Sequence, residues 1–334
     1  MSQPLTGSVL EVEAVRKTFR QSAGIARGMR AIAAVDGVDL RLERGRTVAL
    51  VGESGCGKST LARLILRLHK PDSGRIRLLG HEVQDLSERA FRPLRRHVQM
   101  VFQNPLGSFD PMHTIGTSVA ETMRLRANGG STEGAVGELL TEVGLSPRFA
   151  KLKPRAVSGG ELQRAAIARA LAPHPDLVVM DEPTSALDMS IQGQVLSLLK
   201  ALQERHGLSY LIATHDLRTV RLVADEVMVM YLGQVVESGP TEEILTRPTH
   251  PYTRGLLYAS DLTGRTDEKD RTVRIKGAVR TAEPGFRGCR LVDRCPVAAE
   301  RCREEQELTE VGPGHRARCW RAVTGEYDEE GAIA

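Results

Sequence analysis

Long hydrophobic runs are missing from the sequence. Its apolar blocks, such as residues 177–180, have the length of a strand, whereas a helix that crosses a bilayer needs about 18 or more apolar residues. Residues 1–7 also lack the charged stretch and apolar core of a secretory signal. We therefore expect a cytoplasmic chain whose contact with a membrane depends on a partner.

An excess of charge of one sign is also absent. The 46 lysine and arginine residues against 42 aspartate and glutamate residues leave a formal net charge of +4, spread along the chain. A nucleic-acid-binding protein usually carries a dense basic stripe, so we predict no nucleic-acid partner. The 334 residues, 41% hydrophobic and 26% charged, have the composition of an ordinary globular protein of roughly two domains.

Four short, continuous apolar runs have the pattern of parallel strands that are buried on both faces. They are residues 48–51, 177–180, 210–214 and 227–230. Helical patterns between them, such as residues 61–68 and 195–202, supply the crossovers that a parallel sheet requires. The sequence therefore predicts an α/β fold with a central parallel sheet.

Two other regions differ from this pattern. Residues 9–12 and 35–42 alternate apolar and polar, which predicts a small antiparallel β layer ahead of the main sheet. Residues from about 105 to 165 are helical in character and interrupt the sheet pattern. We interpret them as an inserted helical subdomain.

The last part of the sequence differs again. Strand patterns stop after Gly239, and a polar linker at residues 261–271 leads into an extension at residues 272–334. Four of the five cysteines lie in this extension, between residues 289 and 319. Because structural disulfides are rare in cytosolic proteins, this clustering indicates another role for the thiols.

A glycine-rich segment follows the first buried run. Residues 52–59 read Gly-Glu-Ser-Gly-Cys-Gly-Lys-Ser between a strand and a helix, which is the context of a phosphate-binding loop. The glycines let backbone N–H groups turn toward a phosphate, and the helix N-terminus adds partial positive charge. Lys58 would reach the β- and γ-phosphate oxygens and Ser59 would hold Mg²⁺; a structural turn is the alternative. The predicted nucleotide-binding residues here are Gly52, Glu53, Ser54, Gly55, Cys56, Gly57, Lys58, Ser59 and Thr60.

Two adjacent carboxylates follow the apolar run at residues 177–180. Burial of Asp181 and Glu182 at a strand end would cost free energy unless a cation or an attacking water used them. We predict that Asp181 is a Mg²⁺ ligand and that Glu182 is the base that polarises water. The alternative is a helix cap formed by Asp181 beside a solvated Glu182.

A second phosphate-binding pattern, Val-Ser-Gly-Gly-Glu-Leu-Gln-Arg, stands at residues 157–164, at the start of a helix. It resembles the LSGGQ signature of the ATP-binding subunits of ABC transporters, with Val157 and Glu161 as departures, and the resemblance covers about residues 8–260. It implies a P-loop ATPase core that binds ATP and Mg²⁺. It also implies a dimer in which the signature of one subunit covers the nucleotide of the other. The signature residues are Ser158, Gly159, Gly160 and Glu161.

Four further positions match this family in the expected order. The resemblance implies that Gln103 touches Mg²⁺ or water and that His215 contacts the γ-phosphate. It also implies that Asp188 belongs to a loop that crosses the dimer and that Phe19 stacks on adenine. Each of these is an ordinary structural residue when taken alone. The predicted catalytic set is Lys58, Gln103, Glu182 and His215.

Residues 247–254, Arg-Pro-Thr-His-Pro-Tyr-Thr-Arg, are similar to a segment of the oligopeptide and dipeptide importer branch, which nickel importers share. The cysteine-bearing extension resembles the same branch, and some of its members hold a 4Fe-4S cluster there. The resemblance implies Cys289, Cys295, Cys302 and Cys319 as ligands. The spacing lacks the close C-x-x-C pair of most zinc modules. Four thiolates can still close a tetrahedral zinc site, so a zinc site and free reduced thiols are the alternatives.

The resemblance implies an ATPase subunit that energises import of peptides or related small solutes from the cytoplasmic face of the cell membrane. Its expected partners are a second ABC ATPase subunit, either a paralogue or a copy, two transmembrane permeases and, indirectly, an extracytoplasmic solute-binding protein. We expect the permease contact near residues 103–117, where residues 109–112 offer exposed groups. The alternatives are a soluble ABC-type ATPase that acts on ribosomes or DNA, and the ATPase of an exporter.

Overall fold

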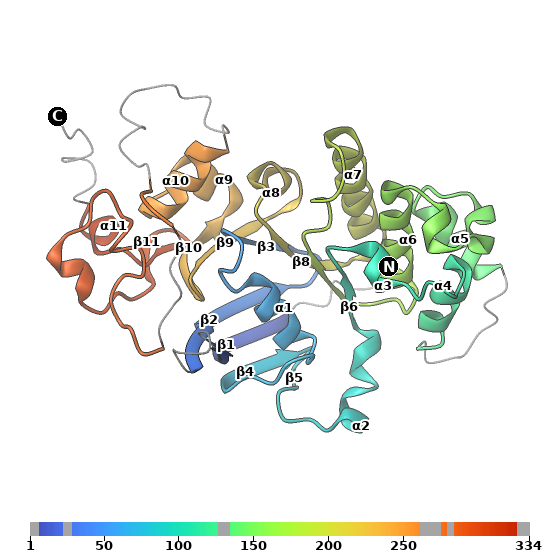
Figure 1. The fold of residues 1–334 in the computed structure, drawn as a ribbon, viewed down its shortest axis with the longest axis horizontal. Helices are drawn as coiled ribbons and strands as arrows, with labels where there is room; N and C mark the ends of the chain where they lie inside the picture. Colours follow the sequence, from blue (N-terminus) through green and yellow to red (C-terminus); the bar gives the residue numbers. More distant parts are fainter. Residues whose placement is uncertain (1–6, 23–28, 126–133, 261–274, 279–283, 326–334) are drawn as a thin grey trace.

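The computed structural model describes residues 7–22, 29–125, 134–260, 275–278 and 284–325. The predicted linker at residues 261–271 and the predicted start of the extension lie outside the described residues. Two sheets and the helices around them form the fold (Figure 1). None of the helices within the described ranges is both long and apolar enough to cross a membrane.

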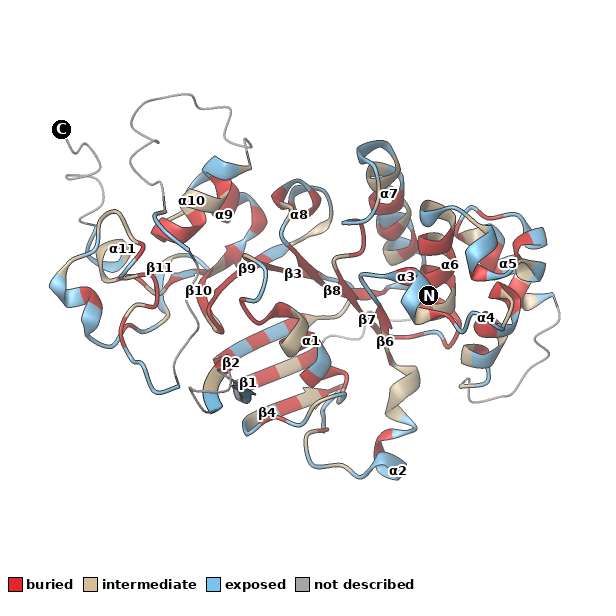
Figure 2. Cartoon of the chain, in the orientation of Figure 1, coloured by how far each residue is buried: buried red, intermediate tan, exposed pale blue. Residues whose placement is uncertain are grey.

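The larger sheet has the strand order β11-β12-β10-β9-β3-β8-β7-β6. Its strands are β3 (Thr47–Val51), β6 (Val98–Val101), β7 (Leu177–Asp181), β8 (Ser209–Thr214), β9 (Glu226–Tyr231), β10 (Gln234–Pro240), β11 (Thr309–Gly312) and β12 (His315–Ala317). The five strands from β9 to β6 run parallel. Every residue of β3, β7 and β8 is buried (Figure 2). The predicted α/β fold with a central buried parallel sheet is therefore confirmed.

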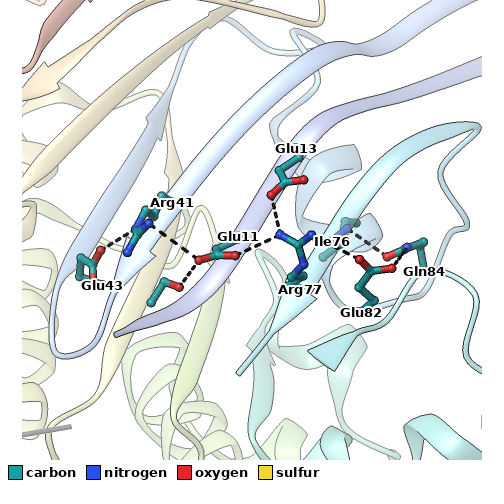
Figure 3. A network of polar contacts seen from close by, with 9 residues as sticks. Glu11, Glu13, Arg41, Glu43, Ile76, Arg77, Glu82 and Gln84 are labelled. Atoms are coloured by element: carbon teal, nitrogen blue, oxygen red, sulfur yellow. Dashed lines mark hydrogen bonds and ion pairs between the residues drawn. The ribbon is translucent and has the colours of Figure 1, made fainter. Parts of the chain in front are cut away.

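The smaller sheet has the order β2-β1-β4-β5, and all of its pairings are antiparallel. Its strands are β1 (Ser8–Ser22), β2 (Met29–Glu43), β4 (Ser73–Leu78) and β5 (His81–Glu82). Buried and more exposed residues alternate along much of β2 (Figure 2), as the alternating sequence pattern predicts. The exposed side carries a network of ion pairs across neighbouring strands, centred on Arg41 and Arg77 (Figure 3).

The helices surround both sheets. Their bounds are α1 (Lys58–Ile65), α2 (Glu88–Phe91), α3 (Pro105–Ser108), α4 (Ile115–Met123), α5 (Ala135–Glu142), α6 (Gly159–Leu171), α7 (Met189–His206), α8 (Leu217–Val223), α9 (Thr241–Thr246), α10 (Pro251–Ala259) and α11 (Trp320–Thr324). Helix α1 lies between the two sheets (Figure 1), where Leu61, Leu64 and Ile65 share one hydrophobic cluster with both of them. The phosphate-binding segment, which leads into α1, is thereby anchored in the main core.

Helices α3 to α6 occupy the region predicted as an inserted helical subdomain, although α6 continues to Leu171. Ile115, Leu140 and Ala166 belong to a second hydrophobic cluster, which also contains residues of β6, β7, β8 and α7. This part of the molecule extends from the β6 edge of the larger sheet (Figure 1). The core therefore connects α6, which follows the signature segment, to the strands that carry the carboxylates.

The prediction that strands stop after Gly239 is wrong. Strands β11 and β12 extend the larger sheet, because β12 pairs with β10 through Glu237 and Ser238. Each of these strands has only three or four residues, which is too short for an alternating pattern to stand out. The C-terminal extension is therefore built onto the larger sheet.

Candidate nucleotide-binding site

A cavity of about 750 Å³ opens beside the phosphate-binding segment. Residues 52–55 and 57–60 form one wall, and Gln103, Glu182 and His215 form another. It lies where the parallel strands end at their carboxyl termini, which is the usual position of a ligand in such sheets. Cavities of 300–1,000 Å³ are typical of small-molecule sites, so the size suits a nucleotide.

Two glycines of this segment allow a close approach of backbone to backbone. Gly52 has φ +156° and Gly57 has φ +116°. A Cβ atom at Gly52 would lie 2.2 Å from the Met230 carbonyl oxygen, and one at Gly57 would lie 2.2 Å from the Ala34 carbonyl oxygen. Neither position therefore accepts a larger residue. Gly57 directly precedes α1, and the first residues of this helix line the cavity. The free N–H groups of the first helical turn are therefore available to a ligand in the cavity.

Lys58 and Ser59 make the polar contacts of the loop. The Lys58 ammonium donates to the carbonyl oxygens of Gly52, at 2.6 Å, and Glu53, at 3.1 Å. The Ser59 hydroxyl donates to Asp181 Oδ1 at 3.0 Å. A hydroxyl and a carboxylate at this separation are hard oxygen donors of the kind that Mg²⁺ prefers beside phosphate oxygens. The structure thus brings together two of the three residues predicted as Mg²⁺ ligands.

Three polar side chains from neighbouring strand ends meet beside this loop. Gln103 follows β6, Glu182 follows β7 and His215 follows β8. Gln103 Nε2 donates to Glu182 Oε2 at 2.8 Å, and His215 Nδ1 lies 3.0 Å from Glu182 Oε1. Three of the four residues predicted as catalytic, Gln103, Glu182 and His215, therefore form one connected group with Glu182 at its centre, and Lys58 lines the same cavity without a hydrogen bond to them.

The signature segment does not line this cavity. Ser158 caps α6. Its hydroxyl and its N–H both donate to Glu161 Oε2, and these hydrogen bonds lower the pKa of the Glu161 carboxyl. Asp188 caps α7 by accepting from the N–H groups of Ser190 and Ile191. Ser158, Gly159 and Asp188 are exposed. Within one subunit, the two predicted phosphate sites are therefore separate.

Phe19 and Cys56 do not line the cavity either. The Phe19 ring packs edge-on against His69, with 5.6 Å between the ring centres, and its stacking on adenine stays a prediction. Cys56 is buried, and this burial raises the pKa of its thiol.

Sequence reasoning missed Ala34 and three residues from the last turn of α10 that complete the cavity wall, namely Leu256, Ala259 and Ser260. No motif marks these four residues. Ala34 lies on β2, and the other three reach the cavity only through the packing of α10 onto the core.

The predicted iron–sulfur ligands are not supported. Among the described residues, no group of three or more His, Cys, Asp or Glu side chains could hold a metal ion. Burial and, to a smaller extent, neighbouring thiols raise the pKa of Cys289 and of Cys295 to about 12. Cys302 Sγ accepts a hydrogen bond from the Trp320 indole at 3.2 Å.

The segment predicted to contact permeases is only partly exposed. Phe109 is buried, with the Arg169 guanidinium 4.6 Å from its ring centre, so its predicted exposure is wrong. Arg169 also donates to the Ser108 carbonyl oxygen. Met112 and Leu106 keep exposed side chains, at 73% and 44%.

Comparisons with known proteins agree with this geometry. Residues 35–185 match the family model described as ABC transporter. The chain is 42% identical over 300 residues to the di/tripeptide transport ATP-binding protein DppF of Pseudomonas aeruginosa, covering 89% of this chain and 93% of that protein. This chain belongs to the ATP-binding proteins of ABC transporters. The oligopeptide transport ATP-binding protein AppF of Bacillus subtilis is 41% identical to it, over 93% of this chain and 97% of the relative.

Two further matches concern the ends of this ABC ATP-binding protein. Residues 236–302 match the family model for the oligopeptide/dipeptide transporter C-terminal region. Among solved structures, the dimeric ATP-binding cassette MJ0796 bound to ADP and Pi has a TM-score of 0.63 and 30% identity, and it covers 70% of this chain. The cassette itself is covered over 98% of its length. This chain is therefore longer than the cassette that it matches.

Proposed function

We propose that this chain is the ATP-hydrolysing subunit of a membrane importer for peptides. The observation that carries the proposal is the Glu182 carboxylate, which joins Gln103 and His215 beside a glycine-rich phosphate loop. The relatives named above transport di- and tripeptides and oligopeptides, and the C-terminal match belongs to the same class. These similarities favour an importer subunit over the two alternatives, a soluble ABC-type ATPase and an exporter ATPase.

Each side chain has a separate task in this proposal. The loop amides and Lys58 bind the β- and γ-phosphates, and Lys58 exchanges its present carbonyl partners for phosphate oxygens. Ser59, Asp181 and Gln103 would hold Mg²⁺, which would neutralise charge on the phosphates. Glu182 accepts a hydrogen bond from the attacking water and so orients it in line with the γ-phosphate. His215 lies at the same carboxylate and would face the γ-phosphate.

The partners of this subunit follow from what the cavity lacks. The signature residues Ser158 to Glu161 stand at the start of α6, where Ser158 and Gly159 are exposed, and none of them lines the cavity of their own subunit. A second ATPase subunit, a copy or a paralogue, therefore supplies the signature that covers the nucleotide. Two permeases bind the exposed part of residues 103–117, which places the protein at the cytoplasmic face of the membrane. An iron–sulfur cluster in the extension has no support and plays no part here.

Peptide uptake tests this proposal. Cells that lack this chain should lose uptake of a labelled tripeptide, and the wild-type chain should restore it. A Lys58→Met variant should leave uptake at background, since its phosphate loop has no ammonium. Lys70→Met is the matched control, because Lys70 is 71% exposed and pairs with the exposed Asp85 carboxylate; it should restore uptake fully.

The two alternatives give different results in the same experiment. If the deletion left tripeptide uptake unchanged while the chain purified with ribosomes or DNA, the protein would be a soluble ATPase. If the deletion reduced export of a solute and not uptake, the protein would serve an exporter. Either result would refute the importer proposal.

A further inference from the structure

A short turn in the C-terminal extension carries two buried arginines that face the ATP-binding core. Arg290 follows Cys289, and Arg294 precedes Cys295. Arg290 pairs with Asp36 of β2 and donates to the carbonyl oxygen of Leu232, and only 2% of its side chain is exposed. A guanidinium that has lost its hydration needs such partners, so this turn is held firmly against the core.

Arg294 makes the second attachment, and its partner lies in the phosphate loop. Its Nη1 is 3.0 Å from Glu53 Oε2 and its Nη2 is 3.3 Å from Glu53 Oε1, so the two groups form a two-pronged ion pair. Nη1 also donates to the Tyr231 hydroxyl at 3.1 Å. The Arg294 side chain is 10% exposed. Burial opposes its charge, but the hydrogen bonds to Glu53 and Tyr231 outweigh burial and raise the pKa of Arg294.

Glu53 is held at its backbone as well. Its N–H donates to the Tyr252 hydroxyl at 2.8 Å, and Tyr252 belongs to α10. Both groups that hold Glu53 therefore come from the part of the chain that follows the catalytic motifs. Glu53 itself lines the cavity, as the second residue of the loop that begins at Gly52.

The charge of Glu53 distinguishes this contact from a simple anchor. A carboxylate in a phosphate loop repels a triphosphate unless a cation compensates it, and in a partly buried site this repulsion is only weakly screened. Arg294 supplies the compensating cation in bidentate geometry, which a lysine cannot reproduce. Arg290 already attaches the turn to the core without contacting the phosphate loop.

We propose that Arg294 is a positioning residue for ATP binding, which neutralises Glu53 and fixes the first turn of the phosphate loop from the C-terminal extension. The inference rests on the proposed function, since it requires the cavity to bind the phosphates of ATP. It makes the extension a determinant of ATP affinity, in addition to its place in the sheet.

Binding of Mg²⁺-ATP to the full-length chain, measured by calorimetry, tests the inference. Arg294→Met should raise the Kd for ATP about 10-fold through the uncompensated charge of Glu53. The KM for ATP should rise with it while kcat changes little, because the pair acts on the bound ground state and the transition state alike. Arg294→Lys should give an intermediate Kd. Arg287→Met is the matched control, since Arg287 is 78% exposed and pairs with the exposed Glu305 carboxylate; its Kd should be that of the wild type.

A second substitution separates neutralisation from attachment. In the double variant Glu53→Gln with Arg294→Met, no carboxylate is left to compensate, so the Kd should return to within about 3-fold of the wild type. The double variant also keeps the test decisive if Arg294→Met alone fails to fold. A merely structural contact would lower the Tm of both variants and leave both Kd values unchanged.

The results for the variants test the role of Arg294, and the result for the wild type tests ATP binding itself. A wild-type Kd in Arg294→Met, or a double variant that binds ATP as weakly as the single variant, would overturn the role of Arg294. A wild-type chain that does not bind ATP would instead remove the proposed function.

Discussion

Glu182 adopts a backbone conformation that few residues other than glycine tolerate, with φ +48°. Such a conformation costs on the order of 1–3 kcal/mol and persists only where neighbouring contacts hold it. Here the Glu182 N–H donates to the Ala213 carbonyl oxygen at 2.8 Å, and both carboxylate oxygens have partners. The carboxylate is therefore fixed at the cavity before any ligand binds.

This geometry predicts the effect of Glu182→Gln. The amide keeps the size of the side chain but cannot polarise water as a carboxylate does, so hydrolysis should fall by about 10²- to 10³-fold, the usual cost of losing a preorganised polar group. The Kd for ATP should stay near that of the wild type. Phosphate release and calorimetry measure the two quantities. Glu204→Gln, at an exposed position of α7, is the control; a Glu182→Gln rate close to the wild-type rate would contradict the assigned role.

Motif spacing led to several residues that the structure brings together at the cavity. Ser59 and Asp181 are 122 positions apart in sequence and meet at 3.0 Å, because strand–loop–helix context places both at one sheet edge. The contact between Glu53 and Arg294 could not be predicted in this way. It depends on how a segment 241 residues further along the chain packs against the loop. Neither a glutamate nor an arginine indicates by its residue type which side chain it will pair with.

At the scale of elements, α10 begins at a buried polar cluster. His250 caps the helix by accepting from the Tyr252 N–H at Nδ1, and its own N–H donates to the Glu237 carboxylate at 3.0 Å. His315 Nε2 lies 2.7 Å from the same carboxylate. This cluster joins α10, which carries Tyr252 to the phosphate loop, to β10 and β12 of the sheet.

The cluster predicts loss of stability in mild acid. Burial, opposed by Glu237, lowers the pKa of His250 from 6.5 to about 4. Between pH 6.5 and about pH 4, His250 therefore carries a proton in the unfolded chain more often than in the folded chain. The free energy of unfolding falls as the pH drops through this range, by about 3 kcal/mol at most. The pKa of Glu237 is also lowered, by hydrogen bonds that outweigh its burial, so a further loss follows below about pH 4.5.

Urea unfolding at pH 7 and pH 5 measures this effect. His250→Asn keeps an oxygen that can cap α10 but removes the titrating ring, so its free energy of unfolding should depend less on pH than that of the wild type. His81→Asn, at an exposed position of β5, should keep the wild-type dependence. An equal dependence in all three proteins would show that His250 does not control acid stability.

Strands and helices could be predicted from the sequence where their hydrophobic pattern was long or where all of their residues were buried. Strands β3, β7 and β8 are buried on both faces, so unbroken apolar runs revealed them. The β11–β12 hairpin is short, and its members include the exposed Glu310 and Arg316. Its pairing with β10 depends on the Glu237 cluster, which no local pattern encodes.

At the scale of the whole molecule, two phosphate-binding helix ends lie apart in one chain. The start of α1 opens into the cavity, whereas the start of α6 is exposed at Ser158 and Gly159 and does not line it. A bound triphosphate would therefore be gripped on one side and left open on the other. Under the proposed function, a second subunit would present its own α6 and close the site, and hydrolysis of the γ-phosphate bond would remove the group that joins the two subunits.

This arrangement predicts a dimer that depends on ATP. Glu182→Gln with Mg²⁺-ATP should double in mass by light scattering, because ATP binds and is not cleaved, whereas the same variant with ADP should stay monomeric. Adding Ser158→Arg, which fills the signature with a bulky cation, should abolish the dimer without raising the Kd of the monomer for ATP. If the natural partner is a paralogous ATPase, the increase in mass appears only when that subunit is added. A Glu182→Gln chain that stays monomeric at saturating ATP, both alone and with its paralogue, would contradict the shared site.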